Sequence, residues 1–309
     1  MSLFLKHLLL HEPIPPPTLT LHGPNSVRAP TTALPLENTT LQSVVHAVME
    51  QIAEERDGNL TDRTALKVVV QMLTELGDLP KKTNTPTTLL SIYNDIFLPQ
   101  VINATEQHYD RFGDACLQSH MTVAPYMQRV ATCLKEEKER CVHYLVYLLP
   151  EEAMLGDKGI NASPMWQGIE RVICTTMLDA KKVESLFEDP TWHQLYEEGR
   201  LTSTETTMNS THTSLQTIWQ VVYLANRQEI LIKSVQSYVE KTGEHLQTTL
   251  QAANPVSEGG KKPNMTALAL KWAGSLLELR KTCDALSALC FENDKALRDA
   301  INAVFLWSS

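Results

Sequence analysis

Residues 123–148 read VAPYMQRVATCLKEEKERCVHYLVYL, and this stretch decides the fold class. Its apolar residues recur every three or four positions, the spacing that keeps side chains on one face of an α-helix. A helix of roughly 22 residues would span about 33 Å. We expect Pro150 to end it, because proline cannot continue a helix beyond its first turn.

The charged centre of this stretch, KEEKER at 135–140, raises the question of a chemical site. Glu136 and Glu137 are adjacent, so on a helix their side chains point about 100° apart and cannot act as an acid/base pair. Glu136 and Arg140 stand four residues apart, in the orientation that favours an ion pair. Glu137 falls on the apolar stripe, which leaves two interpretations open. Either it leans into solvent, or an arginine or a backbone N–H holds it between packed helices and fixes their register.

The rest of the chain continues helix after helix, and no pair of strands is indicated. The predicted fold class is all-α, in stacked helical bundles that make an elongated molecule. We expect a Pro-rich flexible leader at 1–38, a helical bundle at 39–150, and a second bundle at 151–309. The second bundle is expected to contain flexible loops near 202–214 and 254–264.

Local signals predict where individual helices begin and end. The Asp57-Gly58 turn should separate the first two helices, and Pro99 should kink the third. In the second bundle we expect one helix near 165–187, helices near 215–225 and 228–241 with Gly243 closing the latter, and a last helix capped by Asn293.

Charge and cysteine usage exclude several classes of function. The 309 residues carry a net charge of −9, with their lysines and arginines dispersed. This balance makes nucleic acid and anionic membranes poor partners, and the apolar run at the N-terminus is too short to span a bilayer. The six cysteines form no CxxC pair. We interpret them as reduced core thiols of a cytoplasmic or nuclear protein.

No motif for catalysis, cofactor binding or metal binding stands out. Gly259-Gly260 followed by Lys261-Lys262 has the residue types of a phosphate loop but follows no predicted strand. His108 and His143 lie within or beside apolar helical patterns, as packed histidines do. We therefore expect no catalytic, cofactor-binding or metal-binding residues, no cofactor and no small-molecule substrate.

The opening stretch resembles the hallmark helix of the cullin family, the scaffolds of ubiquitin ligases. Three further blocks resemble the family in the same order: EERDGNLTDR at 54–63, IYNDIF at 92–97 with ATEQHYDR at 104–111, and LLELRKTCDALSALCFENDKAL at 276–297. The residues that match the helix form a structural motif and not an active site: Tyr126, Met127, Leu134, Glu136, Glu137, Arg140, Tyr144 and Leu145.

The resemblance implies a stalk of stacked five-helix cullin repeats, with 39–150 as the second repeat and 151–309 as the third. In the family, the first repeat binds a substrate adaptor, and a C-terminal domain recruits a RING protein and accepts a ubiquitin-like modifier. We expect no counterpart here for most of the first repeat or for that C-terminal domain, so none of their functional residues is carried over. LTDR at 60–63 and FEND at 291–294 favour the cullins that use BTB-domain adaptors.

The implied function is that of a non-catalytic scaffold segment, which spaces a substrate adaptor from a RING module in ubiquitin-dependent protein degradation. Its partners would be ubiquitin-ligase subunits, including a BTB-type adaptor, in the cytoplasm, the nucleus or both. Two alternatives stay open: a stand-alone helical tether, and a truncated cullin-like decoy, both without ubiquitin-ligase activity.

Overall fold

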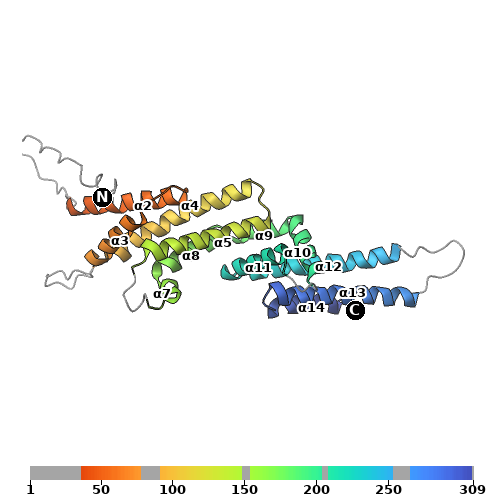
Figure 1. Ribbon diagram of the computed structural model, residues 1–309. Coiled ribbons are helices and arrows are strands. Elements are labelled where there is room, and N and C mark those ends of the chain that lie inside the picture. Colours follow the sequence, from red (N-terminus) through yellow and green to blue (C-terminus); the bar gives the residue numbers. More distant parts are fainter. Residues whose placement is uncertain (1–35, 78–90, 148–153, 204–207, 253–264, 308–309) are drawn as a thin grey trace, which may run out of the picture. The chain divides into compact units, whose positions relative to one another are not determined.

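The computed structural model describes residues 36–77, 91–147, 154–203, 208–252 and 265–307 (Figure 1). Within these ranges the chain forms helices and connecting turns, with no strand, which confirms the all-α class. None of the helices there is long and apolar enough to cross a membrane. Residues 1–35 of the leader predicted at 1–38 and the expected loop at 254–264 lie outside the described residues. Residues 36–38 of that predicted leader are instead the first residues of a helix.

Contacts between helices divide the chain into two compact units. Unit 1 comprises Met1–Ala104 and Lys138–Gly168, and unit 2 comprises Thr105–Glu137 and Ile169–Ser309. Three helices contribute residues to both units: α4 (Leu98–Gln118), α5 (Val123–Arg140) and α8 (Pro164–Thr176). Because units defined by contacts need not follow sequence repeats, the predicted repeat boundary after residue 150 stays a prediction.

In unit 1, α2 (Leu36–Arg56) and α3 (Arg63–Gly77) are joined by the predicted turn. Gly58 has a φ of +87°, a left-handed conformation that glycine adopts without strain. Asp62 caps α3 by accepting a hydrogen bond from the N–H of Ala65 at 3.0 Å. The buried faces of the two helices consist of branched apolar side chains: Val45, Val48, Ile52, Leu66, Val70 and Leu73.

Two π-helical segments, η1 (Ile92–Phe97) and η2 (Cys141–Leu145), pack against α3. η1 runs directly into α4, in whose first turn the predicted kink residue Pro99 lies. Proline lacks an N–H and disturbs the ordinary hydrogen-bond ladder of the turn before it, which is where the π-helical geometry occurs. The hydroxyl of Tyr93 donates a hydrogen bond to the carbonyl of Leu145 at 2.6 Å and so links η1 to η2.

The chain is continuously helical from Val123 to Leu145, first as α5 and then as η2. Val146 has extended backbone angles (φ −112°, ψ 123°), so the helix ends before Pro150 is reached. The face that it buries follows the predicted stripe, with two charged residues included: Val123, Tyr126, Met127, Val130, Cys133, Leu134, Glu137, Arg140, Cys141, Tyr144 and Leu145.

Short helices follow: α7 (Asp157–Ala162) in unit 1, and α9 (Ala180–Glu188) and α10 (Pro190–Thr202) in unit 2. The prediction of a single helix near 165–187 is wrong. α8 ends at Thr176, and Asp179 caps α9 by accepting a hydrogen bond from the N–H of Lys181 at 3.0 Å. A new N-cap therefore divides an apolar pattern that looked continuous.

The second half of unit 2 consists of α11 (Ser210–Leu224), α12 (Gln228–Ala252), α13 (Met265–Cys290) and α14 (Lys295–Trp307). α12 and α13 lie side by side, and α14 packs against both (Figure 1).

α11 begins inside the stretch predicted as a loop at 202–214. The side chain of Asn209 accepts a hydrogen bond from the N–H of His212 at 2.8 Å, and the ring of His212 accepts one from the N–H of Asn209 at 3.4 Å. This reciprocal capping box starts the helix at Ser210. The loop prediction is therefore wrong over 210–214, because the Ser/Thr-rich composition concealed a capped helix start.

Two other predicted helix ends are wrong. α12 continues through Gly243, which lies against Leu276 of α13: a Cβ at Gly243 would come 4.0 Å from the Cδ2 of Leu276. α14 is capped by Asp294, which accepts a hydrogen bond from the N–H of Leu297 at 2.9 Å. Asn293 instead takes the left-handed conformation, with a φ of +56°, in the preceding turn.

The core of unit 2 is a connected group of aromatic rings. The ring of Trp192 meets that of Phe187 edge to face, with centroids 4.8 Å apart, and lies 5.8 Å from that of Tyr196. The Tyr196 ring lies 5.0 Å from Tyr238 and 6.3 Å from Phe291. We call the buried set the aromatic core: Phe187, Trp192, Tyr196, Trp219, Tyr238 and Phe291.

Candidate functional site

The thiols offer little reactivity. All six cysteines are free, and burial raises the pKa of Cys133, Cys174 and Cys290 to about 12. A thiol with so high a pKa is a poor nucleophile and a poor metal ligand near neutral pH. In the described part of the chain, no three His, Cys, Asp or Glu side chains come together in a group that could hold a metal ion.

A buried carboxylate, Glu55, organises unit 1. It accepts hydrogen bonds from the Oγ1 of Thr61 at 3.0 Å, from the Nε and Nη2 of Arg63 at 3.1 and 2.7 Å, and from the hydroxyl of Tyr144 at 3.0 Å. The Nε of Arg140 lies 3.4 Å from the Oε1 of Glu55. Only 8% of the Glu55 side chain is exposed. We call these five residues the Glu55 hub.

The local structure explains how the hub assembles. Glu55 lies in the last turn of α2, and the tight turn at Gly58 returns the chain so that Thr61 and Arg63 face it from the start of α3. Arg140 is the last residue of α5, and Tyr144 lies in η2. The hub therefore joins α2, α3 and the continuous helix of α5 and η2 through an ion pair and through charge-assisted hydrogen bonds, which are stronger than neutral ones.

The electrostatics of Glu55 favour a structural role. Partial burial acts to raise its pKa, but the hydrogen bonds from Arg63, Thr61 and Tyr144 and the charge of Arg140 outweigh burial, so the pKa is lowered. A carboxyl with a lowered pKa is ionised at neutral pH and is a poor general acid. Its oxygens already accept hydrogen bonds from other side chains of the protein, as is typical of a structural carboxylate.

The hub unites two sequence blocks whose contact was not predicted. EERDGNLTDR supplies Glu55, Thr61 and Arg63, and the hallmark helix supplies Arg140 and Tyr144. The predicted pair of Glu136 with Arg140 is wrong, because Arg140 turns to Glu55 of α2. Two features of the sequence could have indicated this contact. Arg140 lies on the apolar face of its helix, and Glu55 lies one turn before Gly58, where the preceding helix ends.

Glu137 forms a second buried polar contact, in unit 2. Its side chain is fully buried, and its Oε1 accepts a hydrogen bond from the hydroxyl of Tyr109 in α4 at 2.8 Å. The interpretation in which Glu137 leans into solvent is therefore wrong, and its burial is confirmed, whereas its role in fixing the register of the helices stays a prediction. The sequence suggested an arginine or a backbone N–H as the donor, and the phenol of Tyr109 was not predicted.

The other motif residues are distributed over both units. Tyr126 is fully buried in unit 2, where its hydroxyl donates a hydrogen bond to the carbonyl of Met177 at 2.7 Å. Met127, Leu134 and Leu145 are buried core residues, and Glu136 is half-buried. The role of the eight residues as a common structural motif stays a prediction.

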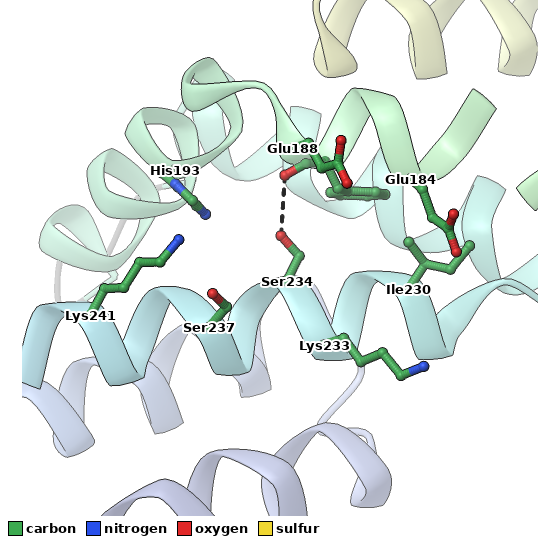
Figure 2. Close-up of a pocket in the computed structure, with 9 residues that line it drawn as sticks. Glu184, Glu188, His193, Ile230, Lys233, Ser234, Ser237 and Lys241 are labelled. Carbon is green, nitrogen blue, oxygen red and sulfur yellow. Dashed lines mark hydrogen bonds between the residues drawn. The ribbon is translucent and has the colours of Figure 1, made fainter. Parts of the chain in front are cut away.

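The surface of unit 2 has a hollow of about 330 Å³ between α9, α10 and α12 (Figure 2). Figure 2 shows His193 and Lys241 directed toward one another at one end, with Glu184 at the opposite end. The volume is at the low end of the range for small-molecule sites. We call it the α9–α12 hollow, and its lining residues are Glu184, Phe187, Glu188, His193, Ile230, Lys233, Ser234, Ser237 and Lys241.

Comparison with known proteins gives a consistent result. The family model described as the cullin alpha solenoid domain matches residues 26–306. Cullin-3 of Dictyostelium discoideum is 31% identical over 108 residues, which cover 35% of this chain and 13% of that protein. Cullin-1 of Caenorhabditis elegans is 31% identical over 114 residues, which cover 36% of this chain and 15% of that protein.

Proposed function

The chain belongs to the cullin family, and from this premise we propose that it is a non-catalytic scaffold segment of a cullin-type ubiquitin ligase. Its task would be to space a substrate adaptor from a RING module during ubiquitin-dependent protein degradation. The aligned regions are a small part of the two curated cullins. The activity and partners of a complete ligase therefore belong to the proposal.

The Glu55 hub is the observation that carries this proposal. A spacer must keep the angle between successive helices, and apolar packing alone tolerates small rotations. Hydrogen bonds from Arg63, Thr61 and Tyr144 and the ion pair with Arg140 restrict those rotations at one point of unit 1. The buried charge is thus used for geometry, as a scaffold requires.

The two short motifs that favour a BTB-type adaptor have internal structural uses. In LTDR, Thr61 and Arg63 belong to the Glu55 hub. In FEND, Phe291 belongs to the aromatic core and Asp294 caps α14. Because these residues support the fold, their contacts give no evidence for a BTB-type adaptor. The proposal of this partner rests on the sequence pattern alone.

Reconstitution of ubiquitin transfer tests the proposal directly. The protein is joined to the adaptor-binding and RING-recruiting parts of a cullin and combined with a RING module and a BTB-type adaptor carrying a substrate, and ubiquitylation is compared with that of Glu55→Ala. If spacing is the function, Glu55→Ala lowers the yield of ubiquitylated substrate and leaves adaptor affinity unchanged. Glu75→Ala is the matched control, because Glu75 is exposed on α3 and bonds only to Gln71 among the described residues.

Failure of the wild-type protein to bind any ubiquitin-ligase subunit would instead favour a stand-alone tether. Binding to an adaptor without support of ubiquitin transfer would favour a decoy. Both alternatives keep the same helices, so only the assembly assay separates them.

The elongated shape implied by stacked repeats has its own test. A compact globule of 309 residues has a radius of gyration of about 19 Å. We expect small-angle scattering to give a larger radius and an asymmetric pair-distance distribution. A symmetric distribution near the globular radius would contradict the stalk.

We also propose that the protein acts in the cytoplasm, the nucleus or both. The support is its set of six free cysteines, which suits a reducing compartment. Fluorescence microscopy of the tagged protein tests this, and accumulation in a secretory compartment would contradict it.

A further inference from the structure

The α9–α12 hollow brings a lysine and a histidine together without a carboxylate between them. His193 projects from α10 and Lys241 from α12, and their side chains point toward one another (Figure 2). Lys241 has no ion pair within the described residues. Two such groups repel each other when both are charged, unless an anion joins them.

Another lysine of unit 2 shows what a satisfied cation looks like. The Nζ of Lys182 lies 2.7 Å from the Oδ1 of Asp114 and 3.4 Å from the Oδ1 of Asp110. Burial acts to lower the pKa of Lys182, but the two aspartates outweigh burial and raise it. The pKa of His193 is lowered, first by burial and then by the charge of Lys241. The pair in the hollow therefore lacks the counter-charge that Lys182 has.

The remaining polar groups of the hollow define what it can accept. Ser234 donates its hydroxyl hydrogen bond to the carbonyl of Phe187 at 3.4 Å. Ser237 lies between Ser234 and Lys241 on α12, and no described residue forms a hydrogen bond with its hydroxyl (Figure 2). The ammonium of Lys241, the imidazole of His193 and the hydroxyl of Ser237 are three hydrogen-bond donors from two helices. This set suits a phosphate group, which has several acceptor oxygens.

We propose that Lys241, His193 and Ser237 form a binding site for one phosphate-type oxyanion, either free or carried on a phosphorylated side chain of a protein. Glu184 and Glu188 line the other part of the hollow together with Lys233. The negative charges of Glu184 and Glu188 would repel a polyanion and limit the site to a single anionic group. This site goes beyond the scaffold function and does not depend on it.

Nuclear magnetic resonance of the histidine rings tests the site. We expect a titration with inorganic phosphate to raise the pKa of His193 by about half a pH unit or more, because a bound anion favours the charged ring. His120 is the internal control, since it is exposed in the turn after α4. An equal change in the pKa of His193 and of His120 would show that phosphate acts only through general electrostatic screening, and would overturn the proposal.

Two matched variants localise the effect. Lys241→Gln should abolish the phosphate-induced pKa change of His193, whereas Lys233→Gln, which removes the same charge from the other end of the hollow, should leave it. Both lysines are exposed, and circular dichroism melting confirms that the variants fold. An unchanged response in Lys241→Gln overturns the site.

A third arm identifies the source of the anion. A phosphoserine peptide that binds at least tenfold more tightly than inorganic phosphate identifies a phosphorylated protein partner, and equal affinities identify a free anion. An unphosphorylated peptide that binds as tightly as its phosphorylated form would overturn the proposal.

Discussion

The Glu55 hub of unit 1 and the aromatic core of unit 2 use opposite means to hold helices together. The hub uses few atoms and strict geometry, with four residues converging on the carboxylate of Glu55. The aromatic core uses six large rings at centroid separations of 4.8–6.3 Å, where many small dispersion terms add up. Directional contacts require particular residue types at fixed spacings, whereas packing requires mainly volume.

The largest expected effect comes from the aromatic core. Trp192 is fully buried and contacts two other aromatic rings, so Trp192→Ala should lower the free energy of unfolding of unit 2 by about 3–5 kcal/mol. Hydrogen exchange of α10 and α13 measures this. The control is Tyr223→Ala, because Tyr223 is 56% exposed. Equal losses in the two variants would contradict a core held by aromatic packing.

The hub should come next. Glu55→Ala leaves Arg140, which is only 5% exposed, without this counter-charge, and should cost about 3 kcal/mol. Hydrogen exchange should accelerate in α3 and stay unchanged in α13. If Glu75→Ala on the exposed face of α3 has the same effect, the hub is no more important than any surface charge.

A smaller effect is expected where a single hydrogen bond reaches a buried carboxylate. Tyr109→Phe removes the hydroxyl that donates a hydrogen bond to Glu137 at 2.8 Å. It should lower the free energy of unfolding by about 1–2 kcal/mol. Chemical denaturation measures the loss. Tyr147→Phe, at a residue that is 38% exposed, should change nothing measurable, and a loss there as large as at Tyr109 would show that burial does not decide the effect.

The smallest effect should appear as a pH dependence of unit 1. The folded pKa of Glu55 is lowered, so its contribution is fully present above the pKa of an unfolded glutamate, about 4.3. That contribution is lost as the pH falls through the lower, folded pKa. Urea denaturation across this acidic range should show that the free energy of unfolding falls less steeply with decreasing pH in Glu55→Gln than in the wild type. Parallel profiles for the two proteins would show that Glu55 is not a source of this pH dependence.

Periodicity was sufficient to predict the class of fold and the buried stripe of α5. It was insufficient at the ends of helices, where one side chain decides: Asp179 divides an apparent helix, and Asn209 with His212 starts another inside a Ser/Thr-rich stretch. The Glu55 hub could not be predicted as a unit, because Glu55 and Arg140 are far apart in sequence. Local spacing instead suggested Glu136 as the partner of Arg140, and tertiary structure overrode it.

The two π-helical segments beside α3 have a consequence for how chains of this type vary in length. A π turn closes its hydrogen bonds over one residue more than an α turn, so η1 and η2 are places where the helix already accommodates an additional residue. Deleting one residue within Cys141–Leu145 would let an ordinary α-helix continue, but would rotate every later side chain by one position. Tyr144 would then leave Glu55. We therefore expect insertions and deletions to be tolerated at η2 only after the tyrosine, and not within η1, where Tyr93 bonds to Leu145 and Phe97 is fully buried.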